Sequence, residues 1–334
     1  MHRSRQKLPF LAWALLVIFL WPKEQGMAAH LYVGAGHQYQ TVRDALNNAQ
    51  SGDTIFIEEG LYEGETAVIR QNDLRIIGLG SGATGRPRLI APAHIPNGKA
   101  IWVIRGDNII LRNLDLSGAR VPHLNGAAIR HEGGHLQIEN SIIHHNQMGI
   151  MTANHAGTSL SIINSTIHSN HLSQAGRRIG HNIYVGRISR FELRGSHVYN
   201  AWIGHNVKSR ARDTLIRHTT IEDSQKASSY LIDLPNGGRV TIDNCVLKKG
   251  VESENNALIS FGSEGLTDDL HTLTISNTLA QAEGPGRILL RNHSDIRPEF
   301  RNNELVGLKP FAEENSGLGR YFRAFKTMIR DIFK

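Results

Sequence analysis

The chain almost lacks cysteine and is poor in aromatic residues. Cys245 is its single cysteine among 334 residues, so no disulfide bond can form within the chain. Phenylalanine, tryptophan and tyrosine make up only 6% of the residues, whereas glycine occurs 33 times. Helical bundles bury large side chains along amphipathic faces, and this composition instead favours many short strands joined by tight turns.

Beyond the N-terminus, the chain also lacks an apolar run long enough to cross a membrane. It begins MHRSRQK, LPFLAWALLVIFLW, PKEQGMAA: a basic segment, an apolar segment and a segment that ends in small residues. This order predicts a secretory signal peptide over residues 1–28, cleaved after Ala28. We therefore expect an exported protein, periplasmic or extracellular. The alternative is that the apolar segment stays uncleaved as a membrane anchor.

Acidic residues are outnumbered by basic ones, 30 to 37, and the formal net charge is +7. A positive protein attracts polyanions such as acidic polysaccharide, nucleic acid or anionic lipid. Export argues against nucleic acid, so acidic polysaccharide is the partner that we expect.

One apolar position recurs along most of the chain. In LQIENSII (136–143) and LSIINSTI (160–167), for example, an apolar residue is followed two positions later by a residue that tolerates a turn. The apolar anchors are Leu111, Ile138, Ile162, Leu193, Ile216, Ile242, Ile275 and Phe300, with spacings of 27, 24, 31, 23, 26, 33 and 25 residues. The turn positions are Asn113, Asn140, Asn164, Gly195, His218, Asn244, Asn277 and Asn302, and Gly78 fits the same place in an earlier stretch.

These turn positions share a physical requirement. Asn and Gly, and His to a lesser degree, accept the left-handed backbone of a sharp bend between strands. If coils stack about 4.8 Å apart, equivalent Asn side chains can hydrogen-bond along the stack. The repeat therefore predicts an all-β fold, a single-stranded right-handed parallel β-helix (solenoid), over residues 29–316. The alternative, a β-sandwich of unrelated strands, would not hold one phase through eight repeats.

A solenoid needs closed ends, because a bare end coil exposes core and unpaired strand edges. An N-terminal capping helix is predicted from an apolar helical face that consists of Val42, Ala45, Leu46 and Ala49. Residues 317–334 predict a C-terminal amphipathic helix with basic flanks. We interpret this helix as a cap or lid; the alternative is peripheral contact with an anionic membrane.

The phrase IGHN occurs twice, at residues 179–182 and 203–206. The distance of 24 residues equals one coil, so the two copies are expected to stack. Alternation then points Ile183, Val207 and, in the following coil, Tyr230 and Ile232 inward. The outward column reads Arg130, Met151, Tyr184, Lys208, Asp233 and Ser260, with Arg210 alongside and His181 and His205 at its border.

This column gathers titratable side chains next to the longest mid-chain insertion, residues 168–180. The predicted catalytic residues are Lys208, Arg210, His205, Tyr184 and Asp233. The predicted substrate-binding residues are His181, Arg212, Arg178, Asn206 and Ser260. The alternative is that the histidines form a turn ladder and that Lys208 and Asp233 form an ordinary cross-strand ion pair. The segments PNGG (235–238) and GSEG (262–265) are interpreted as plain turns; the alternative is that these loops shape a rim and that Glu264 is a ligand.

Two stretches resemble known families. YQTVRDALNNAQSGDTIFIEEGLYEG, which begins at Tyr39, resembles the first coil of pectin methylesterases and of many exported bacterial right-handed β-helix proteins. The later repeats resemble those of the pectate lyase-like superfamily. NVKSRARD (206–213) is distantly similar to the Asn-Lys-Ser strand of alginate and chondroitin lyases, which implies that Lys208 is a base. Where those lyases carry metal-binding glutamates, this chain has Ala201 and Ile203. It also lacks the paired aspartates of the esterases and the Asp-Pro-His-Asp motif of alginate C5-epimerases.

These observations predict an exported lyase that cleaves a uronate-containing polysaccharide by β-elimination. The reaction needs a neutralised sugar carboxylate, for which Arg210 or Arg212 is available. It also needs a base for the C5 proton, Lys208 or His205, and an acid at the glycosidic oxygen, Tyr184. A C5-epimerase would need the same groups. The alternative class is a non-catalytic carbohydrate-binding or cell-envelope scaffold protein. We expect a monomer and assign no metal ligand, and a calcium requirement is left open by the sequence.

Overall fold

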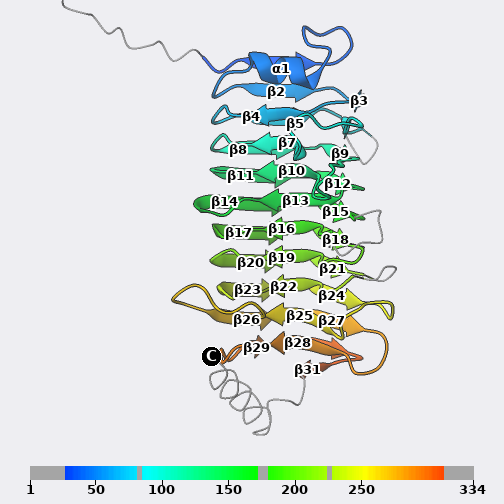
Figure 1. Ribbon diagram of the computed structural model, residues 1–334, viewed down its shortest axis with the longest axis vertical. Coiled ribbons are helices and arrows are strands. Elements are labelled where there is room, and N and C mark those ends of the chain that lie inside the picture. Colours follow the sequence, from blue (N-terminus) through cyan, green and yellow to red (C-terminus); the bar gives the residue numbers. More distant parts are fainter. Residues whose placement is uncertain (1–26, 81–84, 172–179, 224–227, 312–334) are drawn as a thin grey trace, which may run out of the picture.

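The computed structural model describes residues 27–80, 85–171, 180–223 and 228–311. Over these residues the chain winds as a solenoid in which each coil contributes one strand to each of three sheets (Figure 1). From β2 onward, strands that are neighbours in a sheet are three strands apart in the sequence, and all of the pairs are parallel. The predicted all-β solenoid is confirmed.

The three sheets are named A, B and C. Sheet A has eleven strands: β1 (His30–Val33), β2 (Thr54–Ile57), β5 (Arg75–Gly78), β8 (Ile109–Arg112), β11 (His135–Glu139), β14 (His155–Ile163), β17 (Ile188–Arg194), β20 (Asp213–Arg217), β23 (Arg239–Asp243), β26 (Thr272–Ser276) and β29 (Glu299–Arg301). Sheet B has ten: β3 (Leu61–Glu63), β6 (Arg88–Ile90), β9 (Asp115–Ser117), β12 (Ile142–His144), β15 (Thr166–His168), β18 (His197–Tyr199), β21 (Thr220–Glu222), β24 (Val246–Lys249), β27 (Leu279–Ala282) and β30 (Glu304–Val306). Sheet C has ten: β4 (Ala67–Ile69), β7 (Ala100–Ile104), β10 (Ala127–His131), β13 (Met148–Thr152), β16 (Ile183–Val185), β19 (Val207–Ser209), β22 (Ile232–Leu234), β25 (Ala257–Phe261), β28 (Ile288–Asn292) and β31 (Lys309–Phe311).

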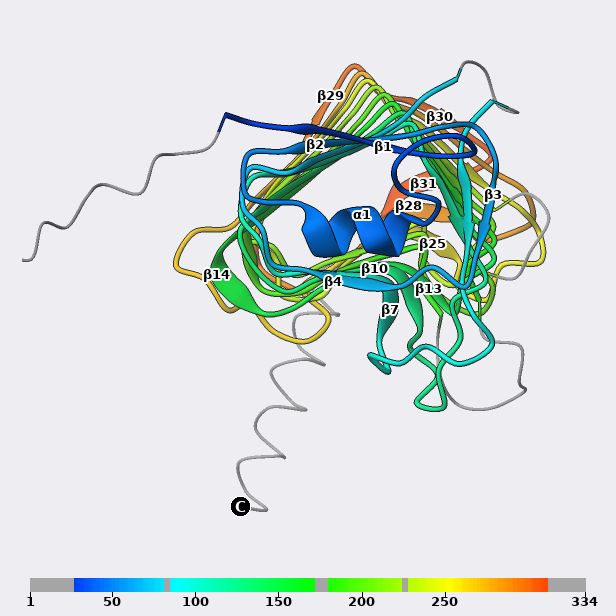
Figure 2. The same ribbon diagram turned by 90° about the horizontal axis from the view of Figure 1, so that it is seen from above.

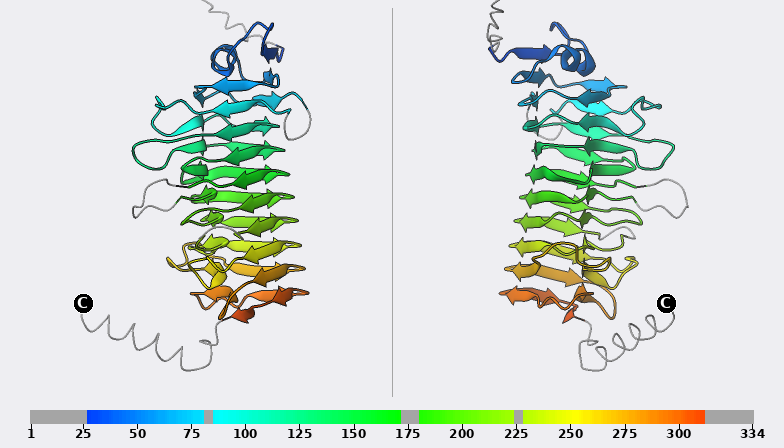
Figure 3. Two further views of the ribbon diagram at one scale, coloured as in Figure 1. Left: turned by 90° about the vertical axis from the view of Figure 1, so that its right-hand side faces the viewer. Right: turned by 60° about the vertical axis from the view of Figure 1, so that its left-hand side comes forward.

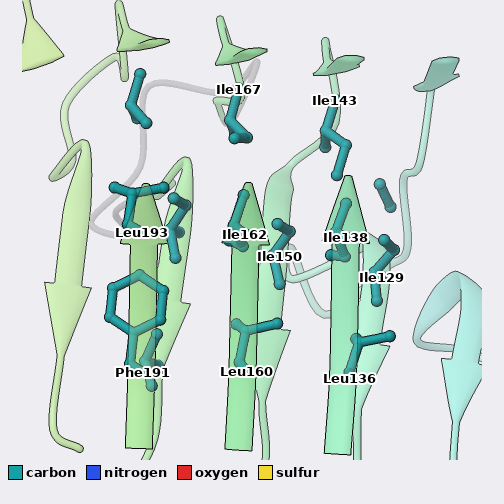
Figure 4. Close-up of a cluster of buried hydrophobic side chains, with 14 of the residues drawn as sticks. Ile129, Leu136, Ile138, Ile143, Ile150, Leu160, Ile162, Ile167, Phe191 and Leu193 are labelled. Atoms are coloured by element: carbon teal, nitrogen blue, oxygen red, sulfur yellow. The ribbon is translucent and has the colours of Figure 1, made fainter. Parts of the chain in front are cut away.

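The apolar anchors stack in one row along sheet A. Leu111, Ile138 and Ile162 are register partners, and the row continues without a slip to Phe300. The anchors from Leu111 to Ile275 are fully buried. Figure 4 shows Leu193, Ile162 and Ile138 side by side on adjacent strands, with side chains of the other sheets near them. Each such side chain contributes roughly 1.5–3 kcal/mol through burial, so this row organises the core.

The corner between sheets A and B is formed by the eight predicted turn positions. All eight have a positive φ, between 46° and 60°, as the left-handed bend requires. Asn140 donates its amide to Asn113 Oδ1 at 3.2 Å, and Asn244 contacts His218 Nδ1 at 2.8 Å. The prediction for Gly78 is wrong. Gly78 does not have a positive φ. Glycine is needed at this position because a Cβ would lie 2.1 Å from the carbonyl oxygen of Asn113.

A second asparagine ladder lies at the corner that leads from sheet B to sheet C. Asn146, Asn170, Asn182 and Asn206 are all fully buried, and each amide donates to the next side-chain oxygen at 2.8–2.9 Å. The same amides also bind carbonyl oxygens at the ends of sheet B strands, such as that of Tyr199. The ladder therefore fixes the point from which the strands of sheet C begin.

The N-terminal end is closed by helix α1 (Val42–Asn48), which lies across the first coils (Figure 2). Its side chains Val42, Ala45 and Leu46 are buried, as predicted. The Glu65 carboxylate accepts the backbone N–H groups of Val42 and Arg43 at 3.1 and 3.0 Å, which satisfies free donors of the first turn.

The longer connections project from the sides of the stacked coils (Figure 3). The predicted C-terminal helix at 317–334 and nearly all of the predicted signal peptide at 1–28 lie outside the described residues. Among the residues that the structure describes, no helix is long and apolar enough to span a membrane.

Candidate active site on sheet C

The outward column of sheet C has the predicted register. Arg130 pairs with Met151, Met151 with Tyr184, and Tyr184 with Lys208. Lys208 pairs in turn with Asp233, and Asp233 with Ser260. Ile183, Val207 and Ile232 are fully buried on the opposite side of the strands. The repeated phrase IGHN therefore does place these polar residues side by side.

Lys208 lies between two carboxylates. Its Nζ is 2.8 Å from Asp233 Oδ2 and 3.3 Å from Glu264 Oε1. Although both strands present these side chains away from the core, Lys208 is only 12% exposed and Asp233 only 4% exposed. Loop residues cover this part of the sheet, so the ion pair is shielded from water and is stronger than a surface pair.

Arg210 joins three parts of the site. Its Nη1 and Nη2 donate to the two oxygens of Glu264 at 2.7 and 2.8 Å, a bidentate pair. Its Nε donates to the Tyr184 hydroxyl oxygen at 3.2 Å, and Nη1 also contacts the side-chain oxygen of Asn236. The hydrogen bonds to Glu264 raise the pKa of Arg210, and Arg210 lowers the pKa of Glu264 to about 2. The pair is therefore ionised at neutral pH.

The two histidines of the repeated phrase are nearly buried and stack with ring centroids 5.0 Å apart. His181 Nδ1 accepts the backbone N–H of His205, and His205 Nδ1 accepts the backbone N–H of Tyr230, both at 3.1 Å. Burial lowers the pKa of His205 to about 3 and that of His181 well below its ordinary value. Each neutral ring therefore carries its proton on Nε2, which in His205 is 3.4 Å from Asp233 Oδ2.

This geometry corrects the role expected for His205. With Nδ1 occupied and Nε2 protonated, the ring has no free lone pair, so His205 is not a base in this arrangement. It orients Asp233 instead. Tyr230, expected to point into the core, is half-buried and its ring lies 5.4 Å from that of His205.

The predicted substrate-binding residues do not all lie on this face. His181 and Ser260 belong to the face, whereas Asn206 is fully buried in the second asparagine ladder and has a structural role. Arg212 is 58% exposed and pairs at 3.5 Å with Asp213, on the sheet A side of the turn, so it does not join Arg210. Arg178 lies outside the described residues.

Glu264 and Asn236 are site residues that the sequence did not place among the catalytic or substrate-binding residues. Both lie in segments that the sequence favours as plain turns, and both contact Arg210, which agrees with the alternative that these loops border the face. Glu264 is 56 residues beyond Lys208 and lies in the connection from β25 to β26, which is longer than the equivalent connection after β22. The available signal was the 33-residue spacing between Ile242 and Ile275, which is the longest in the repeat.

The side chains of this face do not form a metal centre in the described part of the chain. No group of three or more His, Cys, Asp or Glu side chains among the described residues is arranged to hold a metal ion. The face instead brings a guanidinium, an ammonium and a tyrosine hydroxyl together with two carboxylates on one side of the sheet.

Comparisons with known proteins agree with the fold. The family described as "Right handed beta helix region" matches residues 99–309. The solved structure of pectate lyase Pel9A is similar, with 14% identity, a TM-score of 0.56 and coverage of 86% of this chain and 79% of that one. An alginate lyase from Paenibacillus sp. str. FPU-7 has 16% identity, a TM-score of 0.53 and coverage of 84% and 97%. Among curated protein sequences, none matches this chain significantly.

Proposed function

Because the chain belongs to the right-handed β-helix family, we propose that it is a polysaccharide-active protein that cleaves a uronate-containing polymer by β-elimination. Two similar solved structures are named a pectate lyase and an alginate lyase, but the likeness to them concerns the fold alone. The observation that carries the proposal is the grouping of Tyr184, Lys208 and Arg210 on one face of sheet C.

β-Elimination removes the C5 proton, breaks the C4–O bond and forms a C4–C5 double bond, while the leaving oxygen takes up a proton. Arg210 supplies a guanidinium that can neutralise the sugar carboxylate, and so make the C5 proton more acidic. Tyr184 accepts a hydrogen bond from Arg210, so its own proton is available for the leaving oxygen. Lys208 is the candidate base, held in position by Asp233.

A second candidate function is polymer binding without turnover, and the contacts of Lys208 favour it. Lys208 Nζ is already engaged by Asp233 at 2.8 Å and by Glu264 at 3.3 Å, so it is not free to approach the C5 proton of a sugar. In this function the same face binds acidic polysaccharide, and the protein is a binding or scaffold component of the cell envelope. A C5-epimerase would use the same groups without breaking the C4–O bond.

The discriminating experiment offers the purified protein a panel of uronate polymers, with calcium and with chelator. Ultraviolet absorbance reports the unsaturated uronate that elimination leaves, and calorimetry reports binding. We expect Tyr184→Phe to lose turnover and keep binding, because only the hydroxyl is removed. Arg190→Ala is the matched arginine control, since Arg190 is exposed on sheet A and pairs with Glu192. Equal losses in Arg210→Ala and Arg190→Ala, or no binding to any polymer, would refute the proposal.

We also propose that the protein is exported, on the basis of the N-terminal pattern. A fusion of residues 1–28 to a reporter enzyme should deliver the reporter across the inner membrane. A reporter that stays in the cytoplasm would contradict export.

A further inference from the structure

Glu264 is bound by this face in the way that a ligand carboxylate would be. Its two oxygens meet Arg210 in a bidentate pair, and one of them also lies 3.3 Å from Lys208 Nζ. Guanidinium forks of this kind are the usual means of recognising a free carboxylate, and a neighbouring ammonium adds to it. Glu264 is 49% exposed, whereas Lys208 and Arg210 are 12% and 15% exposed. The carboxylate therefore covers the two cations from the solvent side.

The tip of the segment that carries Glu264 is joined to the sheet by few bonds. We call residues 262–271 the Glu264 loop. Gly262 and Gly265 stand on either side of Glu264 with φ angles of 76° and 90°, which glycine adopts at little cost. Besides its ion pairs, Glu264 is held by one backbone hydrogen bond, from its N–H to the carbonyl of Pro235 at 2.9 Å. Asn236 donates to the carbonyl of Gly265 at 3.1 Å. The ends of the loop are held separately: the Gly262 N–H donates to the carbonyl of Leu234 and the Gly238 N–H to His271 Nδ1, both at 2.9 Å. Only the bonds at the tip have to break for Glu264 to move away.

Two polar atoms in the same column lack partners among the described residues. Asp233 Oδ1 and Ser260 Oγ are buried without a hydrogen bond, and their residues are register neighbours on β22 and β25. Leaving a buried polar group without a hydrogen-bond partner is unfavourable. Asp233 also contacts Lys208 through its other oxygen. These two atoms therefore lie beside the cations that Glu264 covers, and a hydroxyl-bearing ligand would satisfy them.

We propose that Glu264 occupies the carboxylate subsite of this face, and that a uronate unit of the polymer displaces it. The sugar carboxylate pairs with Arg210 and Lys208, and sugar hydroxyls reach Asp233 and Ser260. The inference rests on the proposed acidic-polysaccharide ligand but does not require turnover. It assigns the ligand a chemical class: a sugar with one carboxylate and neighbouring hydroxyls, since a neutral sugar would leave both cations paired to Glu264.

The test compares Glu264→Gln with the wild type by calorimetry, using oligogalacturonate and oligomannuronate as probes and an uncharged glucan oligomer as the negative control. Removing the internal competitor should tighten binding to at least one uronate oligomer by about tenfold, because less protein is held in the closed form. Asp269→Asn is the matched control. It removes the same charge from the same loop without touching Arg210, so it reports the general gain from a more positive surface.

Hydrogen exchange gives a second readout on the wild-type protein. If the ligand displaces Glu264, amides of residues 262–271 should exchange faster when the oligomer is bound. Slower exchange would mean that the loop closes over the ligand, which overturns the proposal. The proposal is also overturned if the Glu264→Gln variant binds the uronate oligomer no more tightly than the Asp269→Asn variant does. Glu264→Ala, checked by thermal unfolding, repeats the comparison in case the glutamine still bonds to Arg210.

The outcomes separate this inference from the proposed function. Binding that tightens in Glu264→Gln without any unsaturated product supports the subsite and contradicts the lyase. Cleavage or binding that is unchanged or weaker in Glu264→Gln supports the function and overturns the subsite. If neither protein binds a uronate oligomer, both proposals are wrong.

Discussion

At the scale of single residues, the charges of the sheet C face balance one another at short range. Lys208 and Arg210 meet Asp233 and Glu264, two positive groups against two negative ones, all in direct contact. Because Asp233 is nearly buried and its other neighbour, His205, is neutral, the arrangement depends on the charge of Lys208. A change at any one residue therefore alters both the ligand site and the stability of the coil that carries it.

Lys208→Ala should lower the free energy of unfolding by about 2 kcal/mol, because Asp233 would stay buried without its ammonium partner. As one more charge on a solvated surface, Lys208 could be removed with little change in stability, so the size of the loss reports how well the pair is shielded. Adding Asp233→Asn should recover part of the loss, since a neutral amide is easier to bury. Urea unfolding of the single variants and the double variant measures this coupling. A loss below about 0.5 kcal/mol in Lys208→Ala would show that water solvates the pair.

Buried histidines should make the protein sensitive to mild acid. Burial lowers the pKa of His131 to about 4 and that of His205 to about 3, from 6.5. Above pH 6.5 neither the folded nor the unfolded state binds these protons. As the pH falls below that value the unfolded state takes them up first, so the free energy of unfolding decreases toward pH 4. The loss is on the order of 3 kcal/mol per histidine.

His131→Gln tests this pH dependence. His131 is fully buried and Nε2 donates to the carbonyl of Gly133, a bond that a glutamine amide could replace. The variant should lose stability less steeply than the wild type between about pH 6.5 and 4, with the difference measured by urea unfolding at several pH values. Parallel curves would mean that His131 takes up its proton in the folded protein.

At the scale of elements, the left-handed corner between sheets A and B sets the geometry of each coil. Asn164 has a φ of 48°, in a region where an alanine costs about 1–2 kcal/mol. Asn164→Ala should therefore lower the free energy of unfolding by about that amount, and Asn164→Gly should be closer to neutral. Thermal unfolding of the wild type and of both variants measures these differences in stability. If glycine is as harmful as alanine, the side chain and not the backbone is what the corner needs.

The corners and the apolar row could be predicted because their causes are local. Asn164 and Ile162 each report a backbone or burial requirement at their own position, and the requirement repeats in every coil. The same logic placed Tyr184 over Lys208, since the repeated IGHN fixed the register. Glu264 could not be placed in this way, because its loop occurs once and its partners lie more than fifty positions earlier.

The second asparagine ladder shows a different limit. Asn182 and Asn206 stand 24 residues apart, and the repeated phrase predicted that they stack. Asn170 joins the same ladder only 12 residues before Asn182, because both lie between β15 and β16 of one coil, at the two ends of an insertion. A search for a fixed period compares successive coils and does not find a pair within one coil.

At the scale of the whole molecule, the solenoid keeps the site rigid along its axis. Coils contact mainly their neighbours, so the face is built by the four consecutive strands β16, β19, β22 and β25 and by the loops attached to them. The net charge of +7 belongs to the whole chain, and the excess of basic residues lies in the stretches outside the described residues, above all at the two ends of the chain. Charges spread over the surface can still attract or repel a polyanion at long range. Contact pairs at the face and the field of the whole surface are separate contributions to binding.

Ionic strength separates these two contributions. Raising it from about 0.01 M to about 0.15 M shortens the range of unshielded charge interactions from about 30 Å to about 8 Å. The affinity for a uronate oligomer should therefore fall several-fold in the wild-type protein. Arg190→Ala, which removes an exposed charge on sheet A, should weaken binding only at low salt. Arg210→Ala should weaken it at both, because the partly buried guanidinium acts by direct contact. Calorimetry of the wild-type protein and of the two variants across a salt series measures these affinities. An affinity that salt does not change would show that the ligand is not held by its charge.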